Sequence, residues 1–330
     1  MRAWPFALLA AVGLAACGSR TGLLVPGDGE PENNVDGSTG PSGDDDSGPP
    51  FSDAGPVSDA LPPIDVTVPV DAFNDCPDAG ATLIYVVSKQ NELLSFYPPT
   101  ATFTPIGILS CPDSDPTATP FSMAVDRTGI AYVLYSDGHL FRVSTATAAC
   151  EATRFEPDQS GFTLFGMGYS HDNTDTGETL YVAGGGTQTT PALAMIDTQT
   201  FALHVVGSFR PTILNAELSG TGAGDLFAFY ATQGAAPCNN MAAGVDCTDS
   251  AIGQIDKATG QVTAQTVLRG NAQGMAWAFA FWGGDFYTFT APGGGTIVNR
   301  FSPADGTVVT VATRADFVVG AGVSTCAPAR

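Results

Sequence analysis

The 330-residue sequence predicts an all-β fold, a five-bladed β-propeller that its C-terminal strand closes, preceded by a disordered N-terminal tether. Three observations carry this prediction. A hairpin-like phrase recurs five times, each copy follows a further strand-like phrase, and the small-residue strand missing before the first copy stands near the end of the chain. Internal repetition with a period of roughly 20–50 residues indicates a repeat architecture.

Residues 1–16 have the three parts of a secretion signal. Arg2 is positively charged, Trp4–Gly13 is apolar but too short to span a bilayer, and small residues precede Cys17. The sequence LAAC followed by Gly18 resembles the lipobox of bacterial lipoproteins. That resemblance implies removal of the signal, diacylglyceryl modification of Cys17 and attachment to a membrane through lipid. Gly18 in place of Asp implies the outer membrane, with the protein facing the periplasm or the surface. A non-lipidated signal peptide is the alternative.

Residues 17–75 begin with the lipidated Cys17 and continue as an acidic segment of Gly, Pro, Ser and Asp. This segment shows no apolar periodicity, so it cannot bury enough surface to offset its ordering entropy. As a flexible coil it would span on the order of 40 Å. We therefore expect a disordered tether that holds the domain of residues 76–330 away from the membrane.

The domain consists of repeated strand-like phrases that alternate apolar and polar residues. The hairpin phrase, with turn residues at its centre, starts at Leu93, Leu140, Leu193, Ile252 and Ile297. The phrase before it starts at Ala81, Gly129, Glu178, Gly224 and Gly284. Small-residue strands precede the last four copies, from Phe121, Phe165, Asn215 and Gly274. Each unit thus contains four strands joined by turns.

The first unit lacks a small-residue strand, and FVVGAGVS from Phe317 supplies one at the other end of the chain. This offset predicts a closed ring, which removes exposed sheet edges. The high Gly and Ala content of the small-residue strands is expected for innermost strands that crowd around a narrow central axis. An all-β sandwich is the alternative, although it gives no reason for five matching units. AVDRTGIAYV, from Ala124, resembles the units of NHL-type propeller repeats, which implies the fold but no ligand.

Six cysteines remain after Cys17, an even number that indicates disulfides in an exported protein. Sequence alone allows fifteen pairings of six cysteines. The propeller arrangement selects Cys76–Cys326 at the ring closure, Cys111–Cys150 between two outer strands, and Cys238–Cys247 within one loop.

The two longest loops between second and third strands are Ala183–Pro191 and Ala231–Ser250, and both are expected at the end of the ring where binding loops gather. The second loop is predicted to be braced by Cys238–Cys247. Its polar residues are therefore the candidate ligand-binding set: Asn239, Asn240, Asp246 and Asp249. A surface insertion without a partner is the alternative.

A catalytic site is not predicted, because the sequence contains neither a GxSxG motif nor a phosphate-binding loop. The alternative function is a glycoside hydrolase or lyase acting on a polysaccharide, with Glu217 paired with Asp126 or Asp316. We instead expect a non-enzymatic binding or scaffold module, monomeric, with an envelope protein or glycan as its ligand.

No cofactor is expected, and no metal site, because CxxC spacing and Cys/His clusters are missing from the sequence. The chain carries 33 acidic residues against 12 Lys and Arg, a net charge of −21. Nucleic-acid binding needs a basic surface, so this class of partner is excluded.

Overall fold

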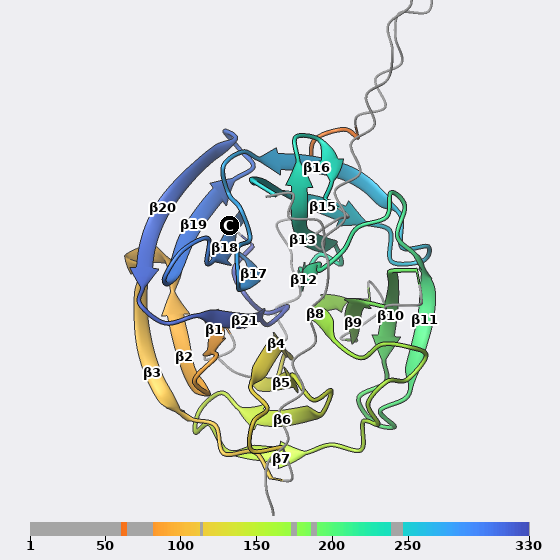
Figure 1. Ribbon diagram of the computed structural model, residues 1–330, viewed down its shortest axis with the longest axis vertical. Helices are drawn as coiled ribbons and strands as arrows, with labels where there is room; N and C mark the ends of the chain where they lie inside the picture. Colours follow the sequence, from red (N-terminus) through yellow and green to blue (C-terminus); the bar gives the residue numbers. More distant parts are fainter. Residues whose placement is uncertain are drawn as a thin grey trace, which may run out of the picture. The chain divides into compact units, whose positions relative to one another are not determined.

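The computed structural model describes residues 61–64, 82–112, 115–172, 177–185, 190–238 and 247–329. In these ranges the chain forms five small antiparallel sheets around a common axis (Figure 1). No helix in the described part of the chain is long and apolar enough to cross a membrane. The predicted five-bladed β-propeller is confirmed.

The first blade joins strands from the two ends of the domain. From the axis outwards it contains β21 (Val318–Val323), β1 (Ile84–Ser88), β2 (Glu92–Tyr97) and β3 (Thr102–Ile108). The C-terminal β21 pairs antiparallel with β1, placing Val323 opposite Ile84 and Gly320 opposite Val87. The strand that the sequence lacks before residue 81 is therefore supplied by the C-terminus, as predicted.

The other four blades each follow the chain outwards from the axis. The second contains β4 (Pro120–Val125), β5 (Ile130–Tyr135), β6 (Leu140–Ser144) and β7 (Cys150–Ala152). The third contains β8 (Phe165–His171), β9 (Glu178–Gly184), β10 (Ala192–Ile196) and β11 (Leu203–Ser208). The fourth contains β12 (Glu217–Gly220), β13 (Leu226–Gln233), β15 (Asp249–Ile255) and β16 (Val262–Leu268), with the short β14 (Ala236–Pro237) beside β13. The fifth contains β17 (Trp277–Trp282), β18 (Asp285–Thr290), β19 (Thr296–Ser302) and β20 (Thr307–Arg314).

The core is divided into five apolar clusters, each lying between two neighbouring blades. β1 shows how one strand serves two of them, because alternate side chains point to opposite faces of a sheet. Ile84 and Val86 pack toward the fifth blade, and Tyr85 and Val87 pack toward the second. Both faces of a blade are thus covered, which explains why every residue of β1 is buried.

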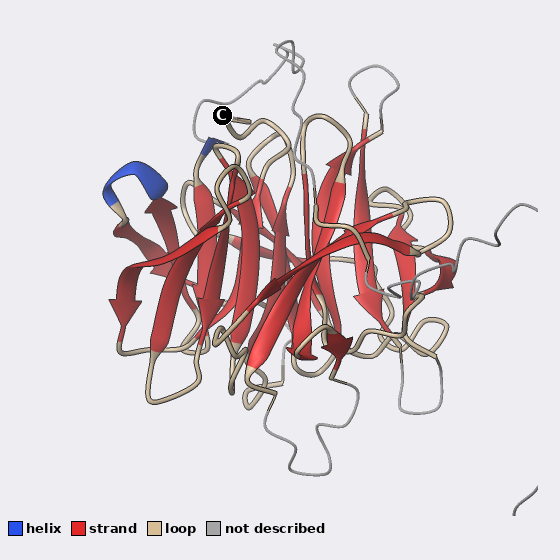
Figure 2. Cartoon of the chain, turned by 90° about the horizontal axis from the view of Figure 1, so that it is seen from above, coloured by secondary structure: helices blue, strands red, loops and turns tan. Residues whose placement is uncertain are grey.

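The two ends of the ring differ in what they carry. We call the end where the innermost strands begin the pocket face, and the end where they finish the C-terminal face. Since each blade is an antiparallel meander, loops between second and third strands lie on the pocket face with the blade-to-blade connections. The hairpin turn that contains the 3₁₀ helix η2 (Pro98–Thr100) lies on the C-terminal face. Figure 2 shows η2 and the C-terminus on the same side of the ring.

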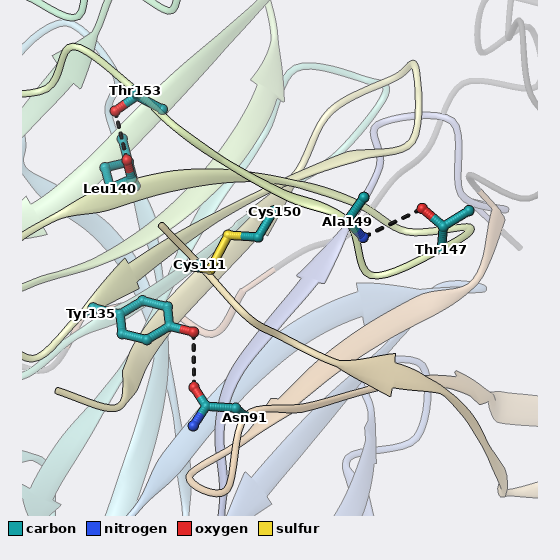
Figure 3. Close-up of a disulfide and its surroundings, with 8 residues drawn as sticks. All are labelled: Asn91, Cys111, Tyr135, Leu140, Thr147, Ala149, Cys150 and Thr153. Carbon is teal, nitrogen blue, oxygen red and sulfur yellow. Dashed lines mark hydrogen bonds between the residues drawn. A yellow bond between two sulfur atoms is a disulfide. The ribbon is translucent and has the colours of Figure 1, made fainter. Parts of the chain in front are cut away.

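Two predicted disulfides are confirmed. Cys111, which follows β3, is bonded to Cys150 at the start of β7, with 5.0 Å between their Cα atoms (Figure 3). This bond joins the outer edges of the first and second blades. Cys238 and Cys247 are bonded to each other and brace the loop between β14 and β15. Cys326 is also disulfide-bonded, while Cys76 lies outside the described residues, so the pairing of these two stays a prediction.

Leu61–Ile64 belong to the segment that the sequence predicts to be tether, yet they pack against the fourth blade. The Gln265 amide donates to the carbonyl of Pro62 at 2.6 Å, and the Ile64 amide donates to Thr266 Oγ1 at 3.3 Å. The Ile64 side chain is buried in the cluster between the fourth and fifth blades. For these four residues, the expectation of disorder is wrong, because β16 offers free backbone groups on its outer edge.

Candidate binding pocket on the propeller axis

Only one residue of the predicted ligand-binding set is described. Asn239, Asn240 and Asp246 lie outside the described residues. Asp249 is the first residue of β15 and is buried, and its two carboxylate oxygens accept hydrogen bonds from the Gly234 amide at 3.1 Å and the Gly270 amide at 2.8 Å. The Asp249 carboxylate therefore joins two loops, and the ligand-binding role of these four residues stays a prediction.

The pocket face is hollowed at the mouth of the axis. One cavity of about 310 Å³ reaches toward the first and second blades, and another of about 460 Å³ reaches toward the third. Phe121, Glu217 and Trp277 line both, so the two cavities meet at these residues. These volumes lie within the range of pockets that hold small molecules.

The walls of the pocket are aromatic because of where the innermost strands begin. Four of the five have an aromatic residue at or beside their first position: Phe121, Phe165, Trp277 and Phe317. The fourth blade differs, since β12 begins with Glu217. Met275, 71% exposed, stands at the rim beside Trp277, and the exposed Lys89 comes from the loop between β1 and β2. The pocket thus combines apolar walls with one acidic residue.

Glu217 lies at the floor of the pocket and connects three innermost strands. It is only 3% exposed, and its Oε2 accepts a hydrogen bond of 2.8 Å from the Ser122 hydroxyl on β4. The backbone amide of Met167 on β8 also donates to the carboxyl. Gly166, which precedes Met167 on β8, has no side chain, and this leaves room for the Glu217 backbone to lie against β8.

The environment of Glu217 favours its neutral form. Desolvation raises the pKa of the carboxyl well above its usual range, whereas the hydrogen bonds from Ser122 and Met167 act in the opposite direction. Burial is the larger cause, because a charge in an apolar surrounding is costly. A neutral carboxyl can donate a hydrogen bond as well as accept one.

The two aspartates that could pair with Glu217 in a hydrolase are placed elsewhere. Asp126 follows the last residue of β4, four residues beyond Ser122, a separation of about 13 Å along an extended strand. Its Oδ1 accepts hydrogen bonds from the amides of Thr128 and Ile130, so it shapes a turn on the C-terminal face. Asp316 forms an ion pair of 2.8 Å with Arg314 and lines neither cavity.

The C-terminal face is crossed by the residues that follow β21. Thr325 donates a hydrogen bond of 2.7 Å to Glu178 Oε2 in the third blade, and its carbonyl lies close to Gly222 in the fourth. The carbonyl of Pro328 accepts a hydrogen bond of 2.6 Å from the Gly283 amide in the fifth blade. This segment therefore contacts the inner turns of three blades on the C-terminal face.

Glu178 gives the C-terminal face a dependence on pH. Desolvation raises its pKa to about 7, although hydrogen bonds from the Arg127 amide and the Thr325 hydroxyl lower it. Asp126 raises the pKa further and the Arg127 charge lowers it. Because the folded state holds this proton more tightly than the unfolded state, Glu178 contributes more stability at low pH, and this contribution is lost as pH rises from about 4.5 to about 7.

Replacing Glu178 by Gln is expected to stabilise the protein near pH 8 by up to about 3 kcal/mol and to change it little near pH 4.5. The amide keeps one acceptor for Arg127 and one donor toward Thr325, but it never becomes charged. Urea denaturation at both pH values measures the difference. Exposed Glu151→Gln is the control and should show no difference between the two. An equal effect of Glu178→Gln at both pH values would contradict the assignment.

Sequence reasoning missed the pocket, although a signal for it was present. Phe121, Phe165 and Trp277 occupy matching places at the starts of three innermost strands. Glu217 departs from the small residues that occupy its own place in the other blades, Ser122, Gly166, Ala278 and Gly320. Compared blade by blade, this departure marks the floor of the pocket. No group of three or more His, Cys, Asp or Glu residues that could hold a metal ion occurs among the residues described.

No protein-family model matches the sequence, and the curated proteins give no match. Solved propeller structures resemble the chain at low identity. They include a chain of a nidogen/laminin complex, with TM-score 0.43, 10% identity, and coverage of 73% of this chain and 97% of that one. TolB from Acinetobacter baumannii has TM-score 0.43 and 11% identity over 76% of this chain and 69% of its own. Exo-β-1,3-galactanase from Phanerochaete chrysosporium has TM-score 0.41 and 13% identity over 64% and 53%. Structural similarity at such low sequence identity indicates neither the ligand nor the chemistry of this chain. The resemblance of residues 124–133 to NHL-type repeats stays a prediction.

Proposed function

We propose that the chain is an envelope lipoprotein whose propeller binds a ligand in the axial pocket and releases it chemically unchanged. The ligand is a molecule of the cell envelope, or a group on an envelope protein or glycan. The tether and the lipid on Cys17 would hold this binding module at a membrane while leaving the ring accessible.

The observation that carries the proposal is the single carboxyl in the pocket. Hydrolysis of glycosides requires two carboxyl groups about 5–10 Å apart, one acting as the acid and the other as nucleophile or base. Among the described residues that line the two cavities, Glu217 is the only acidic one. Its contacts with Ser122 and Met167 position it as part of the floor. An aromatic pocket with one polar floor group is better suited to holding a molecule than to cleaving one.

The proposed anchor is supported by the lipobox resemblance around Cys17 and by the charge of the chain. With a net charge of −21, the protein is repelled by anionic lipid surfaces, so attachment requires lipid on the protein itself. Replacing Cys17 by Ser is expected to abolish incorporation of an alkyne-tagged fatty acid and to move the protein out of the membrane fraction. Labelling that persists in Cys17→Ser would refute the anchor.

The binding role is tested by comparing the full chain with two variants. Trp277→Ala removes a wall shared by both cavities, and Tyr97→Ala removes an aromatic side chain, 46% exposed, next to η2 on the C-terminal face. Each immobilised protein is incubated with glycan, protein and small-molecule fractions of the envelope, and retained molecules are identified by mass spectrometry. We expect retention by wild type and by Tyr97→Ala, at least about tenfold less by Trp277→Ala, and released molecules with unchanged mass. Cleaved products, or equal retention by all three, would overturn the proposal.

A further inference from the structure

We infer that the occupant of the axial pocket is an uncharged group with a compact aromatic body and one hydrogen-bond-accepting oxygen, such as an aryl ketone or amide. This inference rests on the proposed binding function and specifies the chemistry of its ligand.

The walls determine the body of the ligand. Phe121 and Trp277 are half-buried and line both cavities, while Pro120 and Phe317 add apolar surface to the smaller one. Aromatic rings pair favourably with one another beyond their burial of apolar area. The smaller of the two cavities, about 310 Å³, is at the lower end for ligand pockets, so a single ring with a short substituent fits this cavity.

The floor determines the polar atom. Both contacts that the described residues make to the Glu217 carboxyl come from donors, the Ser122 hydroxyl and the Met167 amide. The neutral form of the carboxyl brings an O–H donor of its own, and a buried donor left without an acceptor is costly. An acceptor oxygen on the ligand, placed above Glu217, would satisfy it.

The charges around the pocket disfavour ions of either sign. An anion meets the field of a chain with net charge −21. Among the described residues that line the two cavities, Lys89 is the one cation, and it is exposed and therefore screened by solvent. A cation would require Glu217 to become charged between apolar walls, where both ions lose their hydration. A neutral ligand avoids both costs.

The test uses four probes of similar shape with the full chain: acetophenone, ethylbenzene, benzoate and benzylammonium. They present, in order, a neutral acceptor, no acceptor, an anion and a cation. Ligand-observed NMR titration gives their relative affinities. We expect acetophenone to bind at least about tenfold more tightly than each of the others. Tighter binding of benzoate or benzylammonium would overturn the inference and assign a charged ligand.

Two substitutions of Glu217 separate the hydrogen bond from the shape of the pocket. Glu217→Leu should remove the preference for acetophenone over ethylbenzene, whereas Glu217→Gln keeps an N–H donor and should retain it. Tyr97→Ala should leave all four affinities unchanged, and near-UV circular dichroism verifies the fold of each variant. A preference that survives in Glu217→Leu refutes the role of the floor.

The outcomes also distinguish this inference from the function on which it rests. If none of the probes binds while Trp277→Ala still abolishes retention of an envelope molecule, the inference fails and the binding role stands. If neither the probes nor envelope molecules depend on Trp277, both fail together.

Discussion

A chain that ends at Asp316, without β21 and the residues after it, is expected not to fold. β21 is the innermost strand of the first blade, and five of its residues pair with β1. It also carries Val318, Ala321 and Val323 into the cluster between the first and fifth blades. Loss of this burial and pairing is comparable with the total stability of a domain, about 5–15 kcal/mol. The first blade would present an open apolar edge, which promotes aggregation.

This expectation is measured by size-exclusion chromatography and near-UV circular dichroism of the truncated protein. A synthetic peptide of residues 317–329, added during refolding, should restore the native signal by pairing with β1, and a scrambled peptide of the same composition should not. A soluble truncated monomer with a native spectrum would show that the ring does not depend on its closing strand.

The ring could be predicted from sequence because its evidence is repetitive. Tyr97, Ser144 and Ser302 stand at matching places in the hairpin phrases, and in the structure each ends the third strand of its blade. The extra small-residue strand near the C-terminus showed that one unit is divided between the two ends of the domain. A closed ring is the arrangement that gives this strand a partner. The Cys111–Cys150 bond followed, since closure fixes which outer strands are neighbours.

The pocket could not be predicted in the same way, because residues from separate blades form its floor only when the ring closes. Ser122 and Glu217 are 95 residues apart and come from innermost strands two blades apart. Nothing local in either strand indicates that their side chains meet. Loop length, by contrast, is visible in a sequence, and it directed attention to the loop that contains Asp249. At the start of β15, the Asp249 carboxylate accepts hydrogen bonds from two backbone amides, contacts that loop length does not reveal.

Gly166→Ala is expected to destabilise the protein by about 3 kcal/mol or more, although it adds a single methyl group. A Cβ at Gly166 would lie 2.7 Å from the Cα of Glu217 and closer still to the carbonyl oxygen of Ala216. These are backbone atoms of the neighbouring innermost strand, so neither can move aside by rotating a side chain. The fourth blade would have to shift outwards, which strains the ring at its narrowest point.

Because the shift displaces Glu217 from Ser122, the same variant should lose selective binding in the pocket. Gly293→Ala is the matched control, since a Cβ there meets nothing within 4 Å, and a change below about 0.5 kcal/mol is expected. Urea denaturation of wild type and both variants gives the midpoints and slopes, and an unchanged slope confirms that stability alone has changed. If Gly166→Ala unfolds at the same urea concentration as Gly293→Ala, the innermost strands are not in the close contact that the five-bladed ring requires, and the Glu217 floor is not held by that contact.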